Sequence, residues 1–281
     1  MCQPGNFNFD IIKRKGSVSM ESIVVFDSGL GGITALIEAI HAMPHEHFIY
    51  YGDTLHVPYG PKDPDTIKSY LDHMMEFVAP YHPKAVLLAC NTATVTAADY
   101  LRHRYRLPII GMEPAVKPAI ERDGENKRIL VLSTEGTSRS QRLHSLVERF
   151  DNDHLVDILP LPNLVDFAER LEFDTDDVRA DLEAILSSFD LDDYGAVVLG
   201  CTHFIWYRDL FLDLLPKGVE VLDGNAATIR QLMRKLNGNI CREGAGSLAI
   251  HLTGKRREDV MAFLKKTLPM DFSEIPKGHY E

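Results

Sequence analysis

A chain of 281 residues, 45% apolar and 25% charged, predicts a globular protein with one large domain or two of ordinary size. Its 30 Lys and Arg residues against 41 Asp and Glu give a formal net charge of −11, which argues against a nucleic-acid or anionic-membrane surface, because phosphate binding needs clustered cations. No apolar run approaches the roughly 20 residues that a membrane helix requires.

Residues 1–19 contain a basic stretch, Lys13 to Lys15, but no sustained apolar segment. A secretory signal would need such a segment before Met20. We therefore expect a disordered N-terminal extension over 1–19, with the folded part of the chain starting at Met20.

The folded part opens with a strand, a turn and a helix. Ile23 to Asp27 is a short buried strand, Ser28 to Gly32 is a glycine-rich turn, and apolar residues then recur at helical spacing from Ile33 to Ile40. Such a turn can bring backbone close to an anion, or it can simply pack helix on strand. The spacing does not match the GxGxxG dinucleotide fingerprint, and Asp27 would repel a polyphosphate.

A strand at 47–51 leads into a long polar loop at 52–61, followed by a helix over 64–81. Loops of this length inside compact domains are commonly functional. An ordinary surface turn fits the composition of this loop equally well.

Two apolar runs end in the same way. Residues 85–89 run into Cys90 with Asn91 and Thr92, and residues 196–200 run into Cys201 with Thr202 and His203. Runs of this kind are typical of strands buried on both faces of a parallel sheet. Ligands of open α/β sheets bind at the carboxyl ends of the strands. The pattern therefore predicts one site with a cysteine on each side.

The remaining elements continue the alternation of strands and helices. Residues 112–118, with two prolines, are a plausible crossing point between halves. We expect an α/β fold of two similar domains, each a mostly parallel sheet flanked by helices. The expected strands are 107–111, 128–133, 155–159, 219–222 and 247–252, and the expected helices are 93–105, 164–171, 174–189, 204–215, 226–236 and 255–268.

The four cysteines, Cys2, Cys90, Cys201 and Cys241, include no CxxC pair and no zinc-ligand spacing. This predicts no structural metal, no disulfide framework and a reducing, cytoplasmic setting. Cys241 is interpreted as a buried structural cysteine, which is the usual state of a lone free thiol.

The paired cysteines allow three interpretations. Both could be buried structural residues, or Cys201 could be a nucleophile with His203 as its base, which leaves Cys90 without a role. Alternatively, one thiolate removes a proton from a carbon and the opposite thiol delivers a proton to the other face. The matching contexts favour this two-sided proton transfer, which needs no cofactor.

Four segments resemble glutamate racemase, a member of the aspartate/glutamate racemase family: VVFDSGLGG (24–32), GDTLHVPYG (52–60), ACNTA (89–93) and LGCTHF (199–204). The resemblance extends from Ser22 to Leu268. The two-cysteine scheme is shared with aspartate and hydantoin racemases, but DSGLGG and the PYG loop point to glutamate.

The resemblance implies cofactor-independent interconversion of L- and D-glutamate, which supplies D-glutamate for peptidoglycan. It makes Cys90 and Cys201 the acid/base residues on opposite faces of Cα, with Cys90 acting on the D-enantiomer and Cys201 on the L-enantiomer. Asp27 would assist the first thiol, His203 would assist the second, and Glu169 would support them.

The implied substrate contacts combine hydroxyl, amide and strand-end backbone groups, which can hold two carboxylates and an ammonium. They are Asp27, Ser28, Tyr59, Gly60, Asn91, Thr92, Thr202 and His203, with Thr134 and Thr137 adding to the carboxylate site.

The resemblance also implies a first domain of residues 20–113 plus 223–281 and a second domain of 114–222, with the substrate between them. It implies a homodimer in the cytoplasm, although the sequence alone does not distinguish monomer from dimer.

Two departures, Phe204 to Trp206 after the second cysteine and Asp223 to Asn225, concern the pocket wall and the C-terminal helices. The rivals are a racemase for another small acidic compound, and a binding role on a partner protein.

Overall fold

The computed structural model describes residues 21–122 and 127–275, and the expected extension at 1–19 lies outside this part of the chain. Strands and helices alternate along it as the sequence predicts. The strands are β1 (Ser22–Asp27), β2 (His47–Gly52), β3 (Pro83–Leu88), β4 (Ile109–Gly111), β5 (Arg128–Ser133), β6 (Val156–Pro160), β7 (Tyr194–Leu199), β8 (Glu220–Asp223), β9 (Ser247–Leu252) and β10 (Ser273–Glu274).

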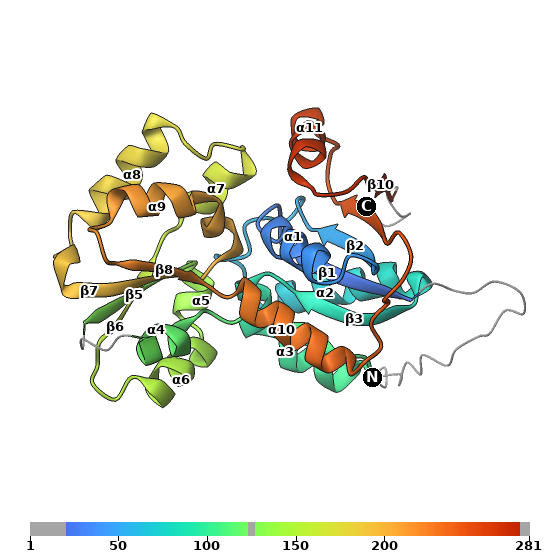
Figure 1. Ribbon diagram of the computed structural model, residues 1–281, viewed down its shortest axis with the longest axis horizontal. Coiled ribbons are helices and arrows are strands. Elements are labelled where there is room, and N and C mark those ends of the chain that lie inside the picture. Colours follow the sequence, from blue (N-terminus) through green and yellow to red (C-terminus); the bar gives the residue numbers. More distant parts are fainter. Residues whose placement is uncertain (1–20, 123–126, 276–281) are drawn as a thin grey trace, which may run out of the picture.

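The strands form two sheets, which lie in two lobes side by side (Figure 1). The larger sheet has the order β10-β9-β2-β1-β3-β4 and the smaller one β6-β5-β7-β8, and neighbouring strands are parallel in both. The chain passes to the second lobe after β4 and returns between β8 and α10 (Asn225–Leu236). The α/β class with two parallel, helix-flanked sheets is confirmed.

The central strands are buried on both faces, as their unbroken apolar sequences predict. In β3 and the residue after it, Ala85, Leu87 and Ala89 pack toward α1, α10 and α11, whereas Val86 and Leu88 pack toward α2 and α3. The strand β7 divides its side chains between two clusters in the same way. Each large apolar side chain buried there stabilises the fold by about 1.5–3 kcal/mol.

The helices flank both sheets (Figure 1). They are α1 (Ile33–Ala42), α2 (Pro64–Val78), α3 (Asn91–Arg104), α4 (Val116–Arg122), α5 (Glu135–Ser138), α6 (Gln141–Phe150), α7 (Asn163–Glu169), α8 (Asp176–Leu186), α9 (Arg208–Leu214), α10 and α11 (Glu258–Thr267), with 3-10 turns η1 (Ala79–Tyr81), η2 (Leu191–Asp193) and η3 (Thr202–Tyr207).

Several elements differ from the sequence prediction. The helix expected over 64–81 ends at Val78 and continues as η1, because Pro80 has no N–H to extend an α-helix. The helix expected over 204–215 begins as η3 and becomes α-helical only at Arg208. The edge strand β10 is two residues long, too short to leave a periodic pattern in the sequence.

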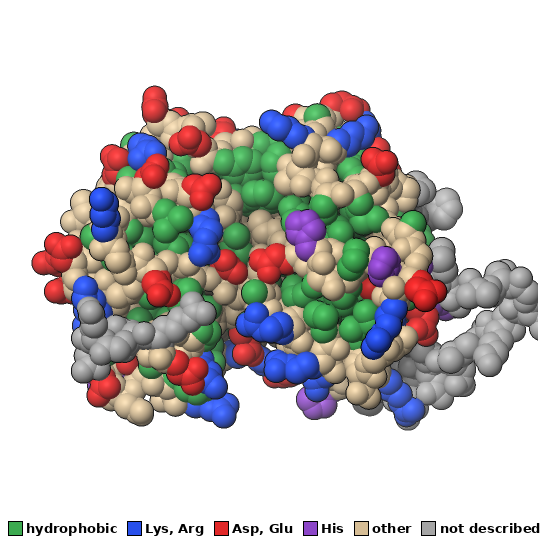
Figure 2. All heavy atoms as spheres, viewed as in Figure 1, with side chains coloured by type: hydrophobic (Ala, Val, Ile, Leu, Met, Phe, Trp, Pro, Cys, Tyr) green, Lys and Arg blue, Asp and Glu red, His purple; other side chains and the backbone are tan. Residues whose placement is uncertain are grey.

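Acidic and basic side chains are both spread over the face of the molecule shown in Figure 2. None of the helices in the described part of the chain is both long enough and apolar enough to span a membrane.

Candidate active site

The two strand-end cysteines line one cavity of about 200 Å³ between the sheets. Most of the residues that the sequence singles out lie in its wall, namely Ser28, Tyr59, Gly60, Cys90, Thr92, Thr134, Cys201 and His203. The other predicted residues stand outside the set of lining residues, namely Asp27, Asn91, Thr137, Thr202 and Glu169. The site therefore has an inner layer and a supporting layer.

Cys90 occupies the N-cap position of α3, directly after β3. Its Sγ accepts the N–H of Ala93 at 3.4 Å, and its thiol donates to Ser28 Oγ at 3.5 Å. Burial, and then the nearby carboxylate of Asp27, raise the pKa of the Cys90 thiol to about 12. The surroundings of this thiol thus favour its protonated form, while the helix N-terminus can support a thiolate once it forms.

Cys201 ends the corresponding strand of the second sheet and precedes η3. Its Sγ lies 3.8 Å from Nδ1 of His203, whose Nε2 is 2.7 Å from Oε1 of Glu169. Burial opposes protonation of His203, but its contacts with Cys201 and Glu169 outweigh that effect and hold the pKa of the imidazole well above its usual value. The surroundings of His203 thus favour its protonated form; its Nε2 lies near both Oε1 of Glu169 and the N–H of Gly31, and its Nδ1 faces the sulfur.

Asp27 joins the two halves behind the cavity. Its side chain is fully buried, Oδ1 accepts the N–H of Gly29 at 2.9 Å, and Oδ2 accepts the hydroxyl of Thr202 at 3.0 Å. Burial raises the pKa of Asp27 above its ordinary value, although His203 and these hydrogen bonds oppose the shift. Asp27 thus lies near Cys90 and is hydrogen-bonded to Thr202, the residue that follows Cys201.

The glycine-rich turn packs against the opposite half of the molecule. A Cβ on Gly31 would lie 2.5 Å from Nδ1 of His203, and one on Gly29 would lie 2.0 Å from Oε1 of Glu169. Both contacts are far shorter than a carbon atom allows. The turn is glycine-rich because the side chains of the second half occupy that space.

The loop over 52–61 contributes residues 58–61 to the wall of the cavity. Tyr59 is 2% exposed, and its hydroxyl donates to the buried carboxylate of Asp53 at 2.6 Å. Thr253 also donates to Asp53, at 2.8 Å, which ties the loop to the end of β9. Gly60 faces Thr134 of the second half.

Three hydroxyls from the two halves meet at the edge of the cavity. Thr92 Oγ1 lies 2.9 Å from Thr134 Oγ1 and 3.3 Å from Thr137 Oγ1, and the last two are 3.1 Å apart. Hydroxyls both donate and accept hydrogen bonds, so such a cluster can rotate its protons toward a carboxylate. Asn91 is buried at the start of α3 beside it.

The sequence analysis missed several lining residues. They are Pro58, Pro61, Glu135, Leu161, Pro162, Val165 and Asp166. The strand-end rule could have found Leu161 and Pro162, because they follow β6 directly.

Elsewhere, Cys241 is partly exposed, so its interpretation as a buried cysteine is wrong. Cys241 lies in the segment between α10 and β9, which has few apolar residues to cover the sulfur. Within residues 21–122 and 127–275, no group of three or more His, Cys, Asp or Glu side chains is arranged to hold a metal ion.

Comparison with known proteins identifies the family to which the chain belongs. A model of the Asp/Glu/Hydantoin racemase family matches residues 28–232, a stretch that contains both cysteines. The chain therefore belongs to this family of isomerases.

Similar proteins include glutamate racemases. Glutamate racemase of Halothermothrix orenii is 44% identical over 84% of this chain and 94% of its own length, and glutamate racemase 2 of Bacillus subtilis is 44% identical over 90% and 97%. The crystal structure of Escherichia coli glutamate racemase in complex with L-glutamate and the activator UDP-MurNAc-Ala superposes with a TM-score of 0.81, at 27% identity, over 91% of this chain and 98% of that one.

Proposed function

We propose that this enzyme interconverts L-glutamate and D-glutamate without a cofactor, by proton transfer at Cα between two cysteines. The observation that carries the proposal is the placement of Cys90 and Cys201 in the wall of one cavity, each at the end of a central strand. Racemisation needs an acid on one face of the carbon and a base on the other, and two thiols can exchange these roles.

In the L-to-D direction, the sulfur of Cys201 takes the Cα proton as the C–H bond breaks, and its electron pair stays on carbon. The thiol of Cys90 then gives its proton to the opposite face, which leaves Cys90 as the thiolate and Cys201 as the thiol. The reverse reaction runs through the same steps in the opposite order. The raised pKa of the Cys90 thiol and the raised pKa of His203, which lies beside Cys201, support this assignment for the L-enantiomer.

Supporting residues divide between the two thiols. Asp27 and Ser28 lie on the Cys90 side, and His203 with Glu169 lies on the Cys201 side. The hydroxyl cluster at Thr92, Thr134 and Thr137, with Asn91, Thr202, Tyr59 and Gly60, is proposed to hold the substrate carboxylates and ammonium through hydroxyl, amide and main-chain groups. The relatives named glutamate racemase support glutamate as the substrate.

We also propose the division into a first domain of 20–113 plus 223–281 and a second of 114–222, which open to admit the substrate. The separate sheets of the two lobes support this division. In the cell, the proposed product D-glutamate supplies peptidoglycan synthesis in the cytoplasm, and the proposed assembly is a homodimer. Light scattering tests the assembly, and rescue of a D-glutamate auxotroph tests the supply role.

The substrate is tested by turnover of the pure enantiomers of glutamate and aspartate, followed by circular dichroism under reducing conditions. We expect both glutamate enantiomers to converge on the racemate and aspartate to turn over poorly. Faster turnover of aspartate would keep the mechanism and change the substrate. Inactivity of folded protein toward both amino acids would instead favour a binding role.

A further inference from the structure

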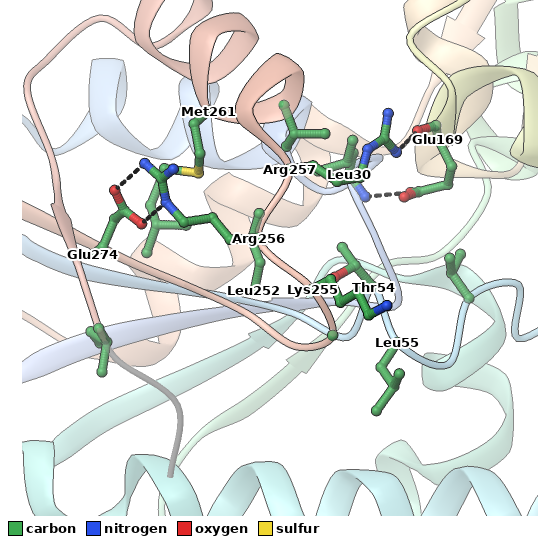
Figure 3. A pocket seen from close by; sticks show the side chains of 15 residues that line it. Leu30, Thr54, Leu55, Glu169, Leu252, Lys255, Arg256, Arg257, Met261 and Glu274 are labelled. Carbon is green, nitrogen blue, oxygen red and sulfur yellow. Dashed lines mark hydrogen bonds and ion pairs between the residues drawn. The ribbon is translucent and has the colours of Figure 1, made fainter. Parts of the chain in front are cut away.

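A segment near the C-terminus reaches the surroundings of Cys201 from outside the catalytic cavity. A second cavity, of about 680 Å³, is lined by residues that include Leu30, Glu169 and Arg257 (Figure 3). Arg257 is the residue before α11, and Glu169 is the last residue of α7 in the other lobe. The second cavity is thus bordered by a contact between the two lobes.

The guanidinium of Arg257 is held in a fixed orientation and points at one main-chain atom. Its Nε and Nη2 donate to the two carboxylate oxygens of Asp259, at 3.3 and 2.6 Å, and its Nη1 donates to the main-chain oxygen of Glu169 at 2.5 Å (Figure 3). The last carbonyls of an α-helix have no partner within the helix. Arginine is well suited to such a carbonyl, because its planar group can bind a carboxylate and still offer a further N–H.

The side chain of Glu169 connects Arg257 to the proposed catalytic residues. Its Oε1 accepts the N–H of Leu30 at 2.6 Å and is 2.7 Å from Nε2 of His203, whose Nδ1 faces the sulfur of Cys201. The side chain of Glu169 is 12% exposed and that of His203 2% exposed, so neither has room to reorient freely. Glu169 is therefore held at its main-chain oxygen by Arg257, and at its side chain by Leu30 and His203.

The helix that follows Arg257 is docked by other contacts. The ring of Phe263 in α11 lies 5.4 Å from the ring of Phe173 and 5.3 Å from that of Trp206, both in the second lobe. This aromatic cluster includes one of the residues that depart from the family pattern. Because these rings hold α11 against the second lobe, loss of the Arg257 side chain should remove a hydrogen bond without releasing the helix.

We propose that Arg257 is a positioning residue for racemisation: it fixes the C-terminus of α7 so that Glu169 presents the imidazole of His203 to Cys201. This inference rests on the proposed function of Cys201 and His203. Neither Arg257 nor Glu169 lines the cavity that contains the cysteines, so the substitution should act on turnover rather than on substrate affinity.

The test compares Arg257→Ala and Arg257→Lys with Arg256→Ala. Arg256 is the matched control, because it lines the same second cavity but pairs with Glu258 and Glu274. For Arg257→Ala we expect kcat to fall roughly 10- to 100-fold, the effect of a slightly misplaced reacting group, with KM close to the wild-type value. The lysine variant should recover part of kcat, and Arg256→Ala should match the wild type. Because the two enantiomers have equal free energy, kcat/KM must fall by the same factor in both directions.

A second readout does not need turnover. The rates at which iodoacetamide alkylates Cys90 and Cys201 are measured by peptide mass spectrometry in each variant. We expect Arg257→Ala to change the rate at Cys201 and to leave the rate at Cys90 unaltered. An active wild type with equal kinetics in Arg257→Ala and Arg256→Ala would overturn the positioning role, and so would equal changes at both cysteines.

Wild-type protein that racemises neither glutamate nor aspartate would refute the proposed function, and the alkylation rates would still decide the role of Arg257. If thermal melting shows that Arg257→Ala does not fold, Asp259→Asn replaces it, because it frees the same guanidinium. A smaller loss of kcat in that variant is expected, and unchanged kcat with unchanged alkylation at Cys201 would overturn the proposal.

Discussion

The ends of β3 and β7 carry the same short sequence pattern but build different surroundings for their cysteines. Cys90 caps a regular α-helix, and its partners are the N–H of Ala93 and the hydroxyl of Ser28. Cys201 is followed by a 3-10 turn, in which Phe204 N–H bonds to Cys201 O, and its partner is the imidazole of His203. The thiol of Cys90 has a main-chain N–H and a hydroxyl as partners, whereas the sulfur of Cys201 faces an imidazole that contacts Glu169.

This difference means that the two thiols are not equivalent before substrate binds. Burial and Asp27 favour the protonated form at Cys90, while the raised pKa of His203 favours the protonated imidazole beside Cys201. Acid/base chemistry on two faces of a carbon can use two groups whose surroundings differ in this way. Two similar parallel sheets therefore hold a site in which the two cysteines have different surroundings.

The largest expected effect comes from removing either thiol. Cys90→Ser and Cys201→Ser should each lower kcat about 10²- to 10⁴-fold, the usual contribution of a positioned acid or base, with little change in far-UV circular dichroism. A serine hydroxyl fits the space but does not ionise near neutral pH. Full activity in either variant would show that racemisation does not require both cysteines.

Glu169→Gln tests the surroundings of Cys201. We expect kcat to fall by roughly 100-fold, because the imidazolium of His203 loses its carboxylate partner. The alkaline limb of the kcat/KM profile should move to lower pH, since the contact with Glu169 raises the pKa of His203. An unchanged profile would show that Glu169 does not control this histidine.

The same variant should change how stability depends on pH. A raised folded-state pKa of His203 contributes stability that is fully present below its ordinary value of 6.5 and is lost as pH rises through the folded-state pKa. Glu169→Gln should therefore destabilise the protein most below pH 6.5 and least in alkaline solution. Urea unfolding of both proteins across this range measures the difference, and a pH-independent difference would contradict the account.

Asp27→Asn tests the residue that connects the two sides. Because burial raises the pKa of Asp27, its ionisation at neutral pH destabilises the folded state. We expect a rise of about 1 kcal/mol in the free energy of unfolding, together with lower kcat, since the field at Cys90 changes. A loss of stability would show instead that the hydrogen bonds to Gly29 and Thr202 outweigh the burial of the charge.

The sequence predicted most of the fold and the inner layer of the site. Both rest on local patterns: unbroken apolar runs give buried parallel strands, and the carboxyl ends of such strands converge. The surroundings of each cysteine could not be predicted in this way. Whether a helix after a strand begins as an α-helix or a 3-10 turn depends on packing against the other lobe, and contacts such as Thr202 with Asp27 join residues far apart in the chain.

The smallest expected effect separates site cysteines from an incidental one. Cys241 is partly exposed and lies 3.9 Å from Nζ of Lys84, outside the catalytic cavity. Cys241→Ser should leave kcat and KM unchanged and alter stability by less than about 0.5 kcal/mol. A large loss of activity would mean that the strand-end position is not what distinguishes Cys90 and Cys201.

The most direct test of the two-thiol account follows L-glutamate in D₂O, with optical rotation and Cα proton NMR recorded together from the earliest turnover. Two separate acids predict that D-glutamate forms with deuterium at Cα while the remaining L-glutamate still carries protium, and the same pattern should appear from D-glutamate. Deuterium entering L-glutamate as fast as it enters D-glutamate would indicate one base serving both faces, and would contradict the account.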